Sequence, residues 1–180
     1  MGNYYYLVPT LPALKSDMTS YMTMEEFLNL CKGYLSKKDF EILSHATLNG
    51  SDEVKGNHFI KEFSHFRSMV DQALIEERAK KLGLNDDIYV NKGEKENRIR
   101  EIVKKAVYSK DPLEGEKIIL NLYWDFLEKE TGLGHYFDLT FLISYALRLQ
   151  ILSRLSVFTV EKGNEEFSKL FGTLKEEIFR

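Results

Sequence analysis

The chain has 180 residues, of which 43% are hydrophobic and 29% are charged, a balance typical of a globular domain rather than a disordered chain. The net charge of −3 gives no basic surplus for a nucleic-acid partner, and Met1–Val8 lacks the basic start and long apolar run of a secretory signal. The single cysteine, Cys31, cannot form an internal disulfide, so we expect a reducing compartment and a cytoplasmic protein.

We expect residues 1–180 to form one all-α domain, an irregular helical bundle around a buried central helix at about residues 139–158. The basis is a set of long helical periodicities in a chain with three prolines. A short extended arm, Tyr4–Val8, precedes the bundle. It is aromatic and β-branched, and Pro9 and Pro12 each push the preceding residue towards extended geometry. Its three tyrosines either pack on the helices or form a protein-binding arm.

Local signals mark the helices that follow the arm. Thr23 and Glu26 have the spacing of a capping box at a helix start, and Ser36 begins a second, shorter helix. A 3.6-residue period over Asn57–Leu82 predicts a long amphipathic helix. Gly83 stands where a glycine commonly ends a helix.

The middle of the chain changes in composition. Residues 85–97 are polar and charged, and we interpret them as a mobile connector that divides the domain into two sub-bundles. A short amphipathic helix is predicted over Arg98–Tyr108. Asp111 as N-cap and Pro112 at the first helical position then predict a helix that runs to about Thr131.

The stretch Phe137–Val160 is apolar on nearly every side at helical spacing, which is typical of a helix buried among other helices. Its length also suits a membrane span. Arg148 and Arg154 argue against that, because each would cost about 2.5–3.5 kcal/mol near a bilayer centre. We therefore predict a core helix whose two arginines reach its polar edge. A last helix is predicted around Phe167–Ile178.

The sequence contains few candidates for a reactive site. His58, Glu62 and His65 share a helix face, and the last two form a Glu-x-x-His unit. A di-iron bundle needs a second such unit, which the sequence lacks, so exposed polar positions are the competing interpretation. Cys31 and Trp124 fit the apolar pattern of their helices. We expect a protein that is not an enzyme and that binds neither cofactor nor metal.

Four phrases together resemble an uncharacterised bacterial family encoded within operons for V-type (A/V-type) ATPases. They are YYYLVPTLPAL at Tyr4–Leu14, FSHFRSMVDQALIEERAKKLG at Phe63–Gly83, DPLEGEK at Asp111–Lys117 and FDLTFLISYALRLQILSRL at Phe137–Leu155. The last phrase also resembles a helix of the V-type ATPase socket protein, which is the C-type subunit in bacteria and the d-type subunit in eukaryotes. Tyr145 would match the central tyrosine of that helix.

The resemblance implies a non-catalytic helical subunit, or an accessory or assembly factor, of a rotary ATPase involved in ion transport. Its partners would be protein subunits on the central-stalk or membrane-ring side, and it would act as a stalk or socket-like adaptor. It would then lie in the cytoplasm, peripheral to the inner membrane through the complex. The socket protein is longer, so this chain could supply only part of such a socket. The alternative is a free-standing helical adaptor unrelated to the ATPase.

Protein interfaces are enriched in tyrosine and arginine, and this enrichment selects the interface candidates. They are Tyr4, Tyr5, Tyr6, Arg67, Arg148 and Arg154. The competing interpretation is intramolecular: the tyrosines would cover the core, and the arginines would pair with acidic residues on neighbouring helices.

Overall fold

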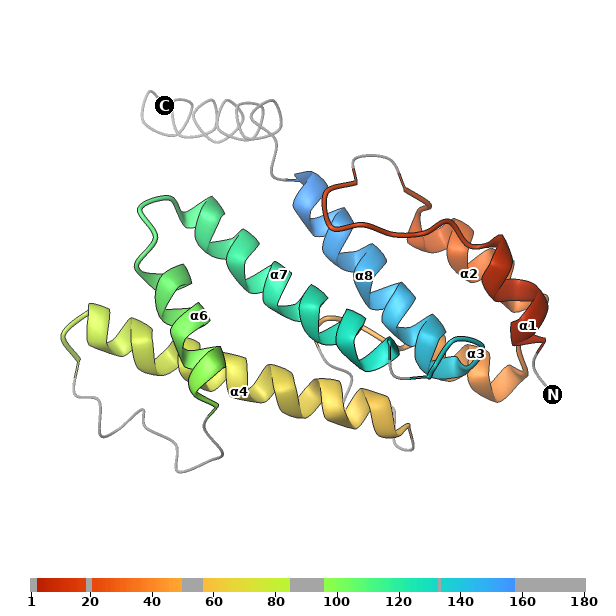
Figure 1. The fold of residues 1–180 in the computed structure, drawn as a ribbon, viewed down its shortest axis with the longest axis horizontal. Helices are drawn as coiled ribbons and strands as arrows, with labels where there is room; N and C mark the ends of the chain where they lie inside the picture. The colour runs from red at the N-terminus through yellow and green to blue at the C-terminus, as the bar shows by residue number, and fades with distance from the viewer. Residues whose placement is uncertain (1–2, 19–20, 50–56, 85–95, 133, 158–180) are drawn as a thin grey trace, which may run out of the picture.

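The computed structural model describes residues 3–18, 21–49, 57–84, 96–132 and 134–157. Over these ranges the fold is an all-α bundle without a strand, as predicted (Figure 1). In chain order the elements are α1 (Tyr4–Leu7), the 3₁₀ turn η1 (Val8–Thr10), α2 (Met24–Lys32), α3 (Lys37–Ser44), α4 (His58–Lys81), α6 (Asn97–Val107), α7 (Pro112–Thr131) and α8 (Leu139–Val157).

The helix α8 lies at the centre of the bundle. It packs on α7 along one side and on α2 and α3 along the other, while α6 bridges α4 and α7 (Figure 1). The expected central helix is confirmed, and every side chain from Leu142 to Leu149 is buried. Among the residues that the structure describes, no helix is long and apolar enough to cross a bilayer.

Residues 85–95 of the predicted connector, and the last helix predicted around Phe167–Ile178, lie outside the described residues. The helices on either side of the connector, α4 and α6, pack on each other. The division into two sub-bundles stays a prediction.

The predicted caps form with the expected geometry. The Thr23 hydroxyl accepts from the Glu26 amide at 3.2 Å while the Glu26 carboxylate accepts from the Thr23 amide at 2.8 Å, a complete capping box. The Asp111 carboxylate caps α7 by accepting from the Leu113 amide at 2.9 Å. Gly83, at φ +68°, ends α4 in a Schellman motif, in which its amide and the next one donate to carbonyls of the last turn.

The extended arm predicted at Tyr4–Val8 is wrong, because this segment is the helical turn α1 followed by η1. The Asn3 carbonyl accepts from the amides of Tyr6 and Leu7, and the turn places Leu7 in the core with no exposed surface. Burial of Leu7 outweighs the pre-proline preference at Val8, which has helical φ and ψ of −57° and −42°. The same preference holds before Pro12, where Leu11 is extended.

Candidate functional site

Three aromatic rings gather on the surface where α1 meets the loop that leads into α8. Tyr5 lies 5.7 Å from Tyr6, ring centroid to centroid, and 5.3 Å from Phe137. Their exposed fractions are 67%, 68% and 49%, and the neighbouring Tyr136 is exposed as well. We call Tyr5, Tyr6 and Phe137 the aromatic patch. Large aromatic side chains clustered in solvent are typical of a surface that binds another protein.

The fold holds both halves of this patch in place. On the α1 side, the Asn3 amide donates to the Tyr34 carbonyl at 2.9 Å and buried Leu7 anchors the turn. On the α8 side, Asp138 caps the helix by accepting from the Phe141 amide at 2.9 Å, and its carboxylate also bonds the His135 ring. The patch is therefore held by the packed turn α1 and by the hydrogen bonds that fix the start of α8, which lowers the entropy lost when a partner binds.

Of the three tyrosines named as interface candidates, only Tyr5 and Tyr6 project into solvent. Tyr4 is half-buried against the bundle, and its pKa is raised, mainly by burial and also by the carboxylates of Asp39 and Asp138. Phe137 completes the patch but was not among the candidates. Its only sequence signal is a pair of adjacent aromatic residues in a loop before a helix cap.

The arginine candidates are separated in the structure. Arg67 pairs with Asp71 on the same helix at 3.4 Å, and Arg154 pairs with Glu116 of α7 at 2.6 Å. Arg154 reaches the polar edge of α8 as predicted, whereas the same expectation for Arg148 is wrong. Arg148 is 8% exposed and its guanidinium stacks over the Trp124 ring at 5.6 Å. The large ring of Trp124, itself in the core as expected, covers the arginine.

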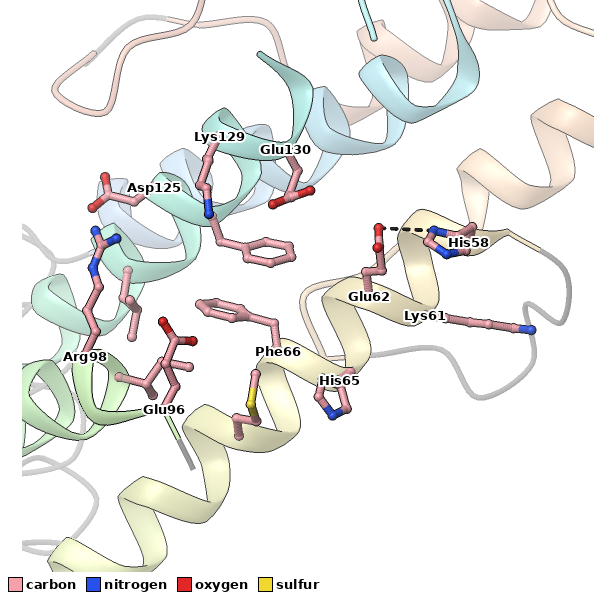
Figure 2. Close-up of a pocket in the computed structure, with 14 residues that line it drawn as sticks. His58, Lys61, Glu62, His65, Phe66, Glu96, Arg98, Asp125, Lys129 and Glu130 are labelled. Carbon is pink, nitrogen blue, oxygen red and sulfur yellow. Dashed lines mark ion pairs between the residues drawn. The ribbon is translucent and has the colours of Figure 1, made fainter. Parts of the chain in front are cut away.

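The histidine and glutamate residues considered for a metal site lie at one end of a hollow between α4 and α7 (Figure 2). The His58 ring Nδ1 lies 3.2 Å from a Glu62 carboxylate oxygen, whereas the His65 ring points away from that pair. Within the described ranges, no three histidine, cysteine or carboxylate side chains are arranged to hold a metal ion. The thiol of Cys31 is buried, and burial raises its pKa to about 12, so it is not poised as a nucleophile.

Comparison with known proteins adds one similarity. Residues 92–178, just under half of the chain, match the model of a family described as a protein of unknown function (DUF2764). The match covers α6, α7 and α8, and therefore includes Phe137 of the aromatic patch but not α1. No curated protein and no solved structure matches the chain.

Proposed function

We propose that the chain is a non-catalytic helical subunit, or an accessory or assembly factor, of a V-type rotary ATPase. It would act as an adaptor that binds protein subunits on the central-stalk or membrane-ring side. The ATPase part of this proposal comes from the four phrases that resemble the operon-encoded family. The observation that carries its binding role is the aromatic patch, which is exposed on α1 and on the loop that leads into α8.

The packing of the resembling phrases supports the proposal. Tyr145, in the last phrase, donates its hydroxyl hydrogen bond to the Pro12 carbonyl of the first phrase at 2.9 Å. The aromatic patch draws its residues from the same two phrases, with Tyr5 and Tyr6 in the first and Phe137 in the last. Two of the four phrases that carry the resemblance, the first and the last, thus meet in the core and together form the aromatic patch.

The test is a pull-down of the tagged full-length chain from detergent-solubilised native membranes. The proposal predicts recovery of V-type ATPase subunits. It also predicts at least about tenfold less recovery with Tyr5→Ser/Phe137→Ser, because truncating central aromatic contacts typically costs at least one order of magnitude in affinity. Tyr108→Ser is the matched control, since Tyr108 is a half-exposed aromatic residue on the distant C-cap of α6.

Two outcomes would contradict the proposal. Recovery of other proteins without ATPase subunits, lost in the patch variant, would favour the free-standing adaptor. Equal recovery of ATPase subunits by the patch variant and the wild-type chain would show that the patch is not part of the interface.

A further inference from the structure

A groove of about 550 Å³ lies between α4 and α7, on elements that do not carry the aromatic patch (Figure 2). Its floor is apolar and centres on Phe66 and Phe126, whose rings stack with centroids 4.1 Å apart and planes at 15°. Met69, Ile99 and Leu122 extend the floor. A concave apolar surface flanked by two helices is suited to the apolar face of a third helix.

The chain already places a helix between α4 and α7 in continuation of this groove. α6 packs on both helices and begins at Asn97, and Glu96 and Ile99 at its start line the groove. α6 is amphipathic, and its buried face consists of Ile99, Val103 and Ala106. The space between α4 and α7 is therefore filled by a helix on one side of Asn97, and no element of the described residues fills it on the other side.

α6 is a basic helix, and one of its cations pairs with α4 beside this space. It carries the cations Arg98, Arg100, Lys104 and Lys105 against one carboxylate, Glu101. The Arg100 guanidinium reaches across to α4, where it lies 3.8 Å from the carboxylate of Glu76, a residue that is 5% exposed. The filled part of the space between α4 and α7 is thus occupied by a basic amphipathic helix, α6.

The other part of this space has carboxylates suited to the same kind of helix. Glu96, Asp125 and Glu130 line it beside three cations, Lys61, Arg98 and Lys129, and no ion pair joins any of these three carboxylates to another described residue. Glu62 lines it too and is paired with the His58 ring. In Figure 2 Glu96, Glu130 and Lys129 point towards the space around the two stacked rings, while Lys61 points away from it. The four carboxylates thus outnumber the two remaining cations, Arg98 and Lys129.

We propose that this groove binds a basic amphipathic helix of a partner protein, lying end to end with α6. The apolar face of that helix would cover Phe66 and Phe126, and its lysine or arginine residues would pair with Glu62 and Glu130. The chain's own residues 158–180 fit less well, because they carry five carboxylates and four cations. The inference does not depend on the partner being an ATPase subunit.

The test measures binding of a labelled synthetic peptide of about 18 residues, long enough to form a helix, to the full-length chain by fluorescence anisotropy. The peptide has leucine at positions i, i+3, i+4 and i+7 and lysine elsewhere. We expect Glu62→Lys/Glu130→Lys to weaken binding about tenfold, because reversing charges that flank an apolar contact turns attraction into repulsion. Glu41→Lys/Glu101→Lys, at exposed positions that do not line the groove, should bind like the wild-type chain.

Three results would overturn the proposal. The groove variant could bind the lysine peptide as tightly as the control variant, which would place the peptide elsewhere. A peptide of residues 158–180 could bind more tightly than the lysine peptide, which would assign the groove to the chain's own C-terminal segment. Sedimentation could reveal a dimer that Glu130→Lys abolishes, which would assign the groove to a second copy.

Discussion

At the scale of single residues, Arg148 is a charged side chain that the described part of the chain places in its core. It is buried on α8, its Nε has no hydrogen-bond partner, and its guanidinium lies over the aromatic face of Trp124. Burial lowers the pKa of its guanidinium, an effect that the carboxylate of Glu128 partly offsets. A buried charge without an ion pair normally costs stability.

We therefore expect Arg148→Met to raise the free energy of unfolding by about 1 kcal/mol, because methionine fills similar space without a charge to desolvate. Urea denaturation at neutral pH measures this. Arg154→Met is the matched control on the same helix, and it should change stability by less than about 0.5 kcal/mol because its pair with Glu116 lies at the surface. A clear loss of stability for Arg148→Met would show that the stacking on Trp124 outweighs the cost of burial.

A second prediction at the residue scale concerns Tyr145. Burial raises its pKa to about 12, from about 10 in the unfolded chain, so the folded state favours the neutral phenol. The stability that the folded state gains from this raised pKa of Tyr145 is fully present below about pH 10 and is lost as the pH rises towards 12. Tyr145→Phe should cost about 1 kcal/mol at neutral pH, because the Pro12 carbonyl loses its donor.

Between neutral pH and about pH 11, the free energy of unfolding should fall less for Tyr145→Phe than for the wild-type chain. Urea denaturation at the two pH values measures the difference. Some loss should remain, because burial also raises the pKa of Tyr123 to about 12. Equal losses in the two proteins would contradict the assignment of a perturbed phenol to Tyr145.

At the scale of elements, the contact between α6 and α7 depends on one glycine. A Cβ added at Gly115 would lie 2.7 Å from the Ala106 carbonyl oxygen, closer than real Cβ contacts. The two helix backbones approach each other at this point because Gly115 has no side chain, and the approach places α6 beside the floor of the groove.

Gly115→Ala should therefore destabilise the protein by about 2 kcal/mol, as overpacking commonly does. Gly33→Ala is the matched control, since Gly33 has helical φ and no atom within 4 Å of its added Cβ, and it should raise stability by about 0.5 kcal/mol. Thermal unfolding compares the two variants. A neutral Gly115→Ala would mean that α6 can move away from α7 without cost.

Sequence patterns predicted the elements that depend on residues close to one another in the chain. The capping pairs at Thr23 and Asp111, and the all-round apolar α8, follow from residues within a few positions of one another. The turn at α1 was missed because its cause is the distant core that receives Leu7. Phe137 was missed for a similar reason, since only the fold brings it against Tyr5, more than a hundred residues away.

At the scale of the whole molecule, the described chain has a closed interior and at least two surfaces suited to binding. The enclosed helix α8 and its neighbours form one continuous hydrophobic cluster, and the aromatic patch and the groove lie on different elements around it. In this account the interior provides rigidity, and recognition takes place at the surface.

Hydrogen exchange followed by mass spectrometry tests this account most directly, with the full-length chain compared free and bound to purified V-type ATPase. The account predicts slower exchange on binding at residues 3–11 and 134–138, which carry the aromatic patch. Exchange in α8 should be slow in both states, because its backbone is enclosed by other helices. Unchanged exchange in the patch segments, or fast exchange through the middle of α8 in the free chain, would contradict it.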